Sequence, residues 1–196
     1  MIINITTGLF IILFFAISVC VYIYRTFRPE QLCSRYYVVV SFVFYTLVLA
    51  KVVLFPIYIF DKAQIPMMYE GAENYIRFYQ FVPFASIRNY FSSGTIIQLA
   101  GNIVLLFPLI IFWDIFTKGK KKISFLTIVG VCTSVLIELY QLLTNYLTGF
   151  PGHVADIDDL ILNSLGVFLA AGVIAIARKK NVDRTFIARL LWVKKD

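Results

Sequence analysis

The chain has 196 residues, of which 60% are hydrophobic and 17% aromatic, whereas only 15% are charged. A soluble domain contains about 45–50% apolar residues, so this composition excludes an ordinary soluble protein. The charges fall in blocks between long apolar runs, and they sum to +7. We therefore predict an integral membrane protein, and we interpret the positive charge as a marker of the cytoplasmic side, with no nucleic acid as partner.

Five apolar segments are long enough to cross a bilayer as helices. They cover approximately residues 5–24, 36–60, 97–116, 123–146 and 159–177. This pattern predicts an all-α polytopic bundle of about five transmembrane helices, which occupies residues 1–180 as one domain. Pro56 is expected to kink the second span or to end its regular part. Residues 181–196 mix basic and apolar side chains, which favours an amphipathic cytoplasmic tail on the inner leaflet.

The segment between the second and third spans, residues 61–96, is polar but rich in Tyr and Phe. Aromatic side chains are enriched where a membrane meets water, so this segment is expected to lie along the membrane interface. We expect a short helix there over residues 71–81.

The basic residues of the loops predict the orientation of the chain. The segments after the first, third and fifth spans hold three, four and seven Lys and Arg residues, or 14 of the 18, whereas three follow the second and fourth spans. The positive-inside rule then places the N-terminus outside and the C-terminus in the cytoplasm. In this orientation the loop that contains His153 faces outward, where a lone histidine is usually only a polar surface group.

The most informative stretch lies at the mouth of the last span, where Asp156, Asp158 and Asp159 precede Asn163 and Gly166. If the stretch is helical, Asp156, Asp159, Asn163 and Gly166 share one face. Helix capping is one interpretation, with Asp156 as the N-cap and Asp159 placed as in a capping box. Capping does not account for the amide of Asn163. Gly166 is expected to let another helix approach this polar stripe closely.

Other polar residues lie inside the predicted spans, where a charged side chain costs at least about 2.5–3.5 kcal/mol. At about 1.5 Å per residue, Lys51 and Glu138 lie roughly 22 Å from the inner face of a core about 30 Å thick. Asn102 and Asn163 lie roughly 6–8 Å from the outer face, and Gln141 is one turn from Glu138. All five therefore belong to the outer third of the membrane. They form either a buried Lys51–Glu138 ion pair with amides that join helices, or a ligand pocket open to the outer leaflet.

The candidate ligand-binding residues combine these two groups, and no metal ligand or cofactor is predicted. Asp114 is set apart, because it precedes the basic residues 118–122 and is expected to pair with them in a structural role. The candidates are Lys51, Asn102, Glu138, Gln141, Asp156, Asp159 and Asn163.

Four segments, taken together, resemble the VanZ-like family of bacterial membrane proteins. They are residues 82–84 (VPF), 101–108 (GNIVLLFP), 137–141 (IELYQ) and 155–166 (ADIDDLILNSLG). The namesake of this family is associated with resistance to the glycopeptide teicoplanin. The resemblance implies a multi-pass protein of the bacterial cell membrane, and it implies a phenotype class rather than a defined reaction.

Three functions fit these residues, and we rank non-enzymatic binding first. In that hypothesis the outward pocket binds a membrane lipid or a lipid-linked envelope amphiphile, and so limits the access of a lipoglycopeptide antibiotic. The second is an enzyme in which Asp156, Asp158, Asp159 and Glu138 hold Mg²⁺ or act as acid and base on a lipid-linked head group. The third is a small transporter that switches through Lys51 and Glu138. The sequence contains no nucleophile–base pair, phosphate-cradling loop or two-histidine metal site, and no internal repeat of the kind found in many transporters.

The predicted orientation can be tested by cysteine labelling in a background without Cys20, Cys33 and Cys132. A cysteine near Glu73 or at Gly152 should react with an impermeant thiol reagent added from outside. A cysteine near Gly119 should react only after the membrane is permeabilised. The reverse labelling pattern would contradict an outward-facing pocket.

Overall fold

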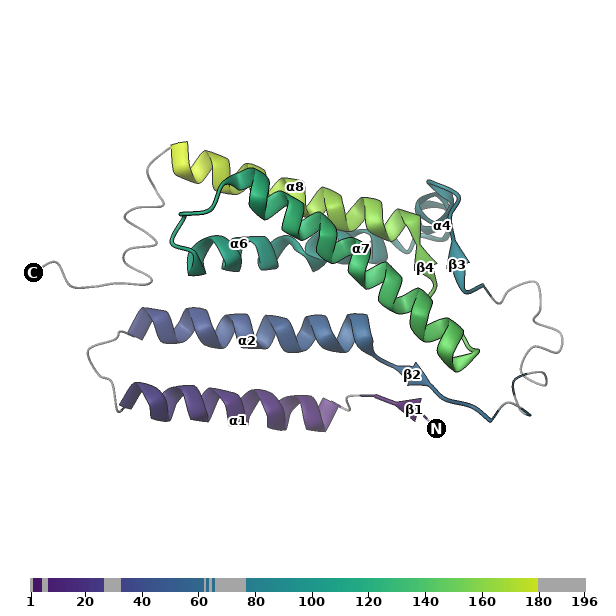
Figure 1. Ribbon diagram of the computed structural model, residues 1–196, viewed down its shortest axis with the longest axis horizontal. Helices are drawn as coiled ribbons and strands as arrows, with labels where there is room; N and C mark the ends of the chain where they lie inside the picture. Colours follow the sequence, from purple (N-terminus) through teal and green to yellow (C-terminus); the bar gives the residue numbers. More distant parts are fainter. Residues whose placement is uncertain are drawn as a thin grey trace, which may run out of the picture.

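The computed structural model describes residues 2–4, 7–26, 33–61, 63, 65 and 77–179. The predicted tail at 181–196 and most of the predicted helix at 71–81 lie outside these residues. The described chain is mostly helical, which confirms the predicted fold class (Figure 1). Its long helices are α1 (Thr7–Thr26), α2 (Cys33–Leu54), α5 (Ile96–Leu105), α6 (Phe107–Phe116), α7 (Ile123–Thr148) and α8 (Ile157–Lys179).

Four stretches of the described chain are long and apolar enough to cross a membrane. They are Tyr37–Leu54, Ile96–Phe116, Ile123–Thr148 and Ile157–Lys179, and α1 adds a shorter apolar run at Gly8–Cys20. These helices match the spans predicted from the sequence to within a few residues, except that α2 ends at Leu54, just before Pro56. This end is expected, because proline interrupts the backbone hydrogen bonds of a helix.

The third span is one apolar stretch but two helices, because it breaks at Leu106 between α5 and α6. Pro108 lies in the first turn of α6, where a missing N–H costs nothing, whereas it would interrupt a continuous helix. The hydroxyl of Tyr45 on α2 donates a hydrogen bond to the carbonyl of Leu105 at 2.8 Å. A side chain of the neighbouring helix therefore gives a carbonyl at the break its partner.

Helix α8 packs against α5, α6 and α7, whereas α1 packs against α2 at the opposite edge of the molecule (Figure 1). The core between these helices is apolar along most of its length. Its fully buried side chains include Leu106 just before α6, Ile110 of α6, Leu126 of α7, and Val167 and Ala170 of α8.

Gly166 allows α5 and α8 to come into backbone contact. A Cβ atom at this position would lie only 1.9 Å from the carbonyl oxygen of Ile103 on α5. No side chain fits there, so the close approach predicted for Gly166 is confirmed. The same two helices are joined by a hydrogen bond between Asn102, which adjoins Ile103, and Asp159, which lies about two turns before Gly166.

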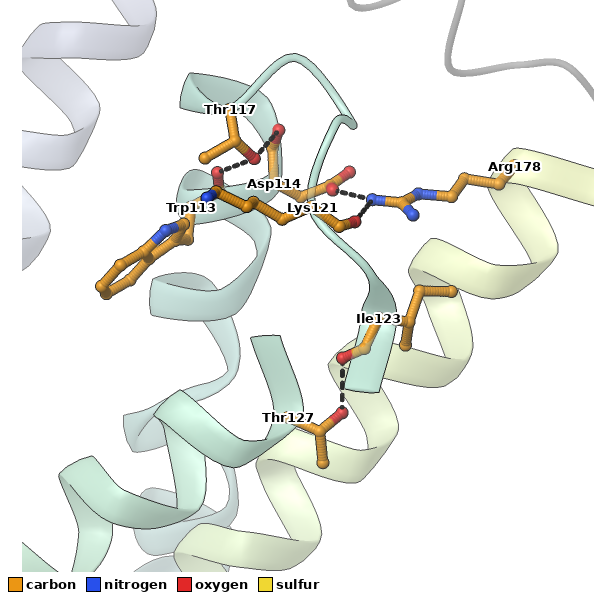
Figure 2. Close-up of polar contacts among 7 residues, drawn as sticks. All are labelled: Trp113, Asp114, Thr117, Lys121, Ile123, Thr127 and Arg178. Atoms are coloured by element: carbon orange, nitrogen blue, oxygen red, sulfur yellow. Dashed lines mark hydrogen bonds and ion pairs between the residues drawn. The ribbon is translucent and has the colours of Figure 1, made fainter. Parts of the chain in front are cut away.

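At the basic end of the bundle, Arg178 near the C-terminal end of α8 connects α8 with α6 and with the turn that follows α6 (Figure 2). Its guanidinium forms an ion pair with the buried carboxylate of Asp114 on α6 and donates a hydrogen bond to the carbonyl of Lys121 at 3.0 Å. The structural role predicted for Asp114 is therefore correct, but the predicted partner is wrong. The side chain of Arg178 reaches Asp114 because α8 ends beside the turn between α6 and α7 (Figure 1).

Short strands and a short helix cover the other end of the bundle. Strand β1 (Ile2–Ile3) pairs antiparallel with β2 (Ile57–Tyr58), and β3 (Tyr79–Gln80) pairs parallel with β4 (Ala155–Asp156). The described part of the predicted helix at 71–81 is thus a strand, because its backbone pairs with the chain just before α8. The helix of this segment is instead α4 (Ala85–Ser93).

The contact at Gly166 predicts a large effect from one added methyl group. Gly166→Ala should lower the free energy of unfolding by about 2–3 kcal/mol or more, because a packed backbone must move. Gly172→Ala on the same helix is the matched control, since a Cβ atom there meets nothing within 4 Å. Thermal unfolding in detergent should therefore separate the two variants, and equal midpoints would contradict the backbone contact.

Candidate functional site

The carboxylate of Asp158 is fully buried and caps a helix other than its own. Its Oδ1 accepts a hydrogen bond from the amide of Phe84 at 2.6 Å, and its Oδ2 accepts from Ser86 at 2.8 Å and Ile87 at 3.1 Å. The local N-cap of α4, Phe84, makes no side-chain capping bond. Asp158 therefore supplies the acceptors that the start of α4 lacks, and its charge lies at the positive end of the α4 dipole.

Asp156 is the N-cap of α8, as the sequence predicts. Its Oδ1 accepts a hydrogen bond from the amide of Asp158 at 2.8 Å, and it also receives bonds from the side chains of Gln80 and Ser86. The predicted common face is wrong for this residue, because Asp156 lies in strand β4 and α8 begins at Ile157. Asp156 thus joins β3, α4 and α8.

The capping box predicted for α8 does not form with Asp159. The backbone N–H of Asp156 donates instead to Oε2 of Glu138, at 2.8 Å. In a capping box this N–H is bound by the acidic residue three positions on. Here α7 brings Glu138 to that place, because α7 and α8 pack closely along their length. Asp159 is consequently available for another contact.

Asp159 and Asn102 connect α8 with α5. The side-chain amide of Asn102 donates a hydrogen bond to Oδ1 of Asp159. Within the part of the chain that the structure describes, the second oxygen of Asp159 accepts no hydrogen bond. Asp159 is half-buried and lines a cavity, so its second oxygen is a free acceptor at the cavity wall.

A cavity of about 490 Å³ lies between α2 and α5, with contributions from α4, α6 and α8. One end is polar and is formed by Tyr90, Gln98, Asn102 and Asp159. Burial and then the negative charges of Asp159, Asp156 and Asp158 raise the pKa of Tyr90, so its hydroxyl stays protonated. The remaining walls are Tyr45, Val48, Leu49, Val52, Gly101, Val104, Leu105 and Pro108.

Lys51 does not form the ion pair with Glu138 that the sequence analysis considered. Its ammonium lies over the ring of Phe10 on α1, 5.6 Å from the ring centroid, in a cation–π arrangement. Glu138 binds the amide of Asp156 instead. The two residues lie at similar depths but point to different neighbours, and depth alone does not predict a contact.

Gln141 and Asn163 are both buried in the helix bundle. Neither Oε1 of Gln141 nor Oδ1 of Asn163 has a hydrogen-bond partner among the described residues. They do not line the cavity between α2 and α5. The structure therefore brings Asn102 and Asp159 to the cavity, places Glu138 and Asp156 in the adjoining network, and leaves Gln141, Asn163 and Lys51 elsewhere.

The loop before β4 is held by Asn145, which the sequence analysis did not select. Its side-chain nitrogen donates to the carbonyls of Phe78 at 3.1 Å and His153 at 2.5 Å, and its oxygen accepts from the amide of Gly152 at 3.1 Å. His153 in turn contacts the carbonyl of Phe55 through Nε2, at 3.0 Å. This loop positions the chain that enters β4 and Asp156.

The sequence analysis selected Asn102 and Asp159 but none of the other cavity-wall residues, among them Tyr90, Gln98 and Gly101 near the polar end. For two of them a signal was available, because Gln98, Gly101 and Asn102 have the i, i+3, i+4 spacing of one helix face. Tyr90 is one of many aromatic residues in its segment, so nothing local distinguishes it. The described residues contain no group of three or more His, Cys, Asp or Glu side chains arranged to hold a metal ion.

Comparison with protein families gives one decisive match. The family model described as VanZ/LLP1 matches residues 42–178, which include every residue of the cavity. The chain belongs to the VanZ/LLP1 family. The match confirms the resemblance found in the sequence. Together with the four stretches able to cross a membrane, it identifies this VanZ/LLP1-family chain as a membrane protein. Comparisons with curated proteins and with solved structures found no significant match.

The capping role of Asp158 predicts a local effect in this VanZ/LLP1-family protein. Asp158→Ala should speed hydrogen exchange of the amides at Ser86 and Ile87 by about tenfold or more, because hydrogen bonds to a charged group contribute about 1.5–3 kcal/mol each. Asp61→Ala is the control, since that exposed carboxylate accepts, among the described residues, from Ala63 at 3.1 Å and not from α4. Unchanged exchange in α4 of Asp158→Ala would contradict the capping role.

Proposed function

We propose that this VanZ/LLP1-family protein binds an amphiphile of the outer leaflet of the bacterial cell membrane, in the cavity between α2 and α5. The observation that carries the proposal is the cavity itself, about 490 Å³ in volume, with apolar walls and a polar end. Ligand sites of this size combine apolar walls with a few placed polar groups. A membrane lipid or a lipid-linked envelope precursor has an apolar chain that suits these walls and a polar head group that suits the polar end.

The position of the apolar walls supports entry of the ligand from the membrane. Val52 on α2 is 50% exposed and Val104 on α5 is 59% exposed, and both line the cavity. Both helices belong to stretches able to span the membrane, so these exposed side chains lie where lipid chains would contact them. The acyl chain of an amphiphile can therefore move sideways from the leaflet into the cavity.

The family supports a link with glycopeptides of the teicoplanin type. Under the orientation predicted from the loop charges, the polar end of the cavity lies toward the outer surface. An amphiphile held there limits the access of a lipoglycopeptide antibiotic to the outer leaflet. The lipoglycopeptide itself, which also carries an acyl chain, is a second ligand of the same chemical type.

The cavity can be filled without disturbing the backbone. Gly101 lines the cavity, and a Cβ atom there meets nothing within 4 Å. Gly101→Leu should reduce amphiphile binding by about tenfold or more, because the new side chain takes the place of the ligand chain. Gly172→Leu is the matched control, since it adds the same side chain at a site on α8 that is equally open and does not line the cavity.

The two variants and the parent are purified in a mild detergent, and bound lipids are identified by mass spectrometry. Cells that produce them at equal membrane levels are tested for growth in teicoplanin. The parent and Gly172→Leu should retain an amphiphile and protect the cells, whereas Gly101→Leu should do neither. Retention and protection by Gly101→Leu at the parent level would contradict the proposal.

A further inference from the structure

We infer that the head group held at the polar end of the cavity is a cationic amine, an inference that rests on the proposed amphiphile binding. Asp159 is the charged residue of the cavity wall, and its second carboxylate oxygen has no partner among the described residues. The wall contains no Lys, Arg or His. A ligand with a positive charge supplies what this end of the cavity lacks.

Asp156 and Asp158 differ from Asp159 because several backbone and side-chain donors already surround them. Asp158 accepts three backbone N–H bonds, and Asp156 accepts from the amide of Asp158 and from two side chains. Among the described residues, Glu138 accepts from the amide of Asp156 alone, but it does not line the cavity. Asp159 lines the cavity, and its one donor among these residues is the neutral amide of Asn102. A partly buried carboxylate with one neutral donor is costly, so a cationic partner would stabilise it most.

No basic side chain of the described residues lines the cavity or forms an ion pair with Asp159. Lys51 lies over the ring of Phe10, and Arg178 binds Asp114 at the opposite end of the bundle. Arg88 of α4 is exposed and does not line the cavity. Asp159 forms no ion pair with any described residue. We therefore infer that its cationic partner is the head group of a bound ligand.

The other polar groups of the cavity suit an ammonium group. An ammonium has three N–H donors and no acceptor. The free oxygen of Asp159, the hydroxyl of Tyr90 and the side-chain carbonyl of Gln98 are three acceptors at the same end of the cavity. A phosphate or carboxylate head group would instead face the charge of Asp159, with Asp156 and Asp158 behind it. The cavity therefore favours an amine over an anionic head group.

The inference is tested with three probes that share one chain, namely octadecylamine, octadecanol and stearate. Binding of each to the purified full chain is measured by native mass spectrometry in a neutral detergent at neutral pH. The parent should bind octadecylamine about tenfold or more tightly than octadecanol, with stearate the weakest. This comparison needs no variant, so equal binding of the amine and the alcohol would by itself overturn the inference.

Asp159→Asn assigns the preference to one residue. Asparagine keeps the oxygen that binds Asn102 but removes the charge, so octadecanol should bind as to the parent while the preference for the amine disappears. Asp61→Asn removes an exposed carboxylate elsewhere and should keep the preference. An unchanged preference in Asp159→Asn would overturn the inference.

Gly101→Leu distinguishes failure of the inference from failure of the proposed function. If Gly101→Leu loses all three probes while the parent shows no preference for the amine, the cavity binds amphiphiles and only the cationic head group is wrong. If Gly101→Leu binds the probes as the parent does, the cavity is not the binding site, and the proposed function and the inference both fall.

Discussion

The buried carboxylate of Asp158 is the constraint on which one end of this bundle depends. A carboxylate away from water is tolerated only where donors surround it, and the first amides of α4 provide three. This contact attaches α4 to the start of α8 and so places Tyr90 at the cavity. Asp156 and Glu138 follow the same rule with other N–H donors. An acidic cluster can therefore exist here without a basic partner, and Asp159 is the carboxylate that brings an unbonded oxygen to the cavity wall.

The spans and their ends were predictable from the sequence because each depends on local chemistry. Long apolar runs form helices in a membrane, Pro56 follows the end of α2, and Gly166 marks a close helix contact. The role of Asp158 was not predictable in this way. Capping is usually a contact within one turn, whereas the amide of Phe84 lies 74 residues before the carboxylate it binds. Only the packing of α4 against α8 brings them together.

Two contacts that the sequence suggested differ from those in the structure, and the reason is the same for both. Counting residues along a helix gives the depth of a side chain but not the direction in which it points. Lys51 and Glu138 are half-buried polar residues of neighbouring spans, yet one points to α1 and the other to the start of α8. Asp114 similarly lies close in sequence to four lysines but binds Arg178, because α8 ends beside it. Direction depends on how the helices are rotated, which one sequence does not reveal.

The dependence of α4 on α8 has a consequence for biosynthesis. A ribosome makes α4 and α5 well before α8, so the first amides of α4 and the side-chain amide of Asn102 emerge without the acceptors they use in the finished protein. Until the last of the described spans enters the membrane, the polar end of the cavity has no carboxylate. The site is therefore completed only when α8 is inserted, and a chain that stops before Asp156 would have the described helices α1 to α7 but no acidic end to its cavity.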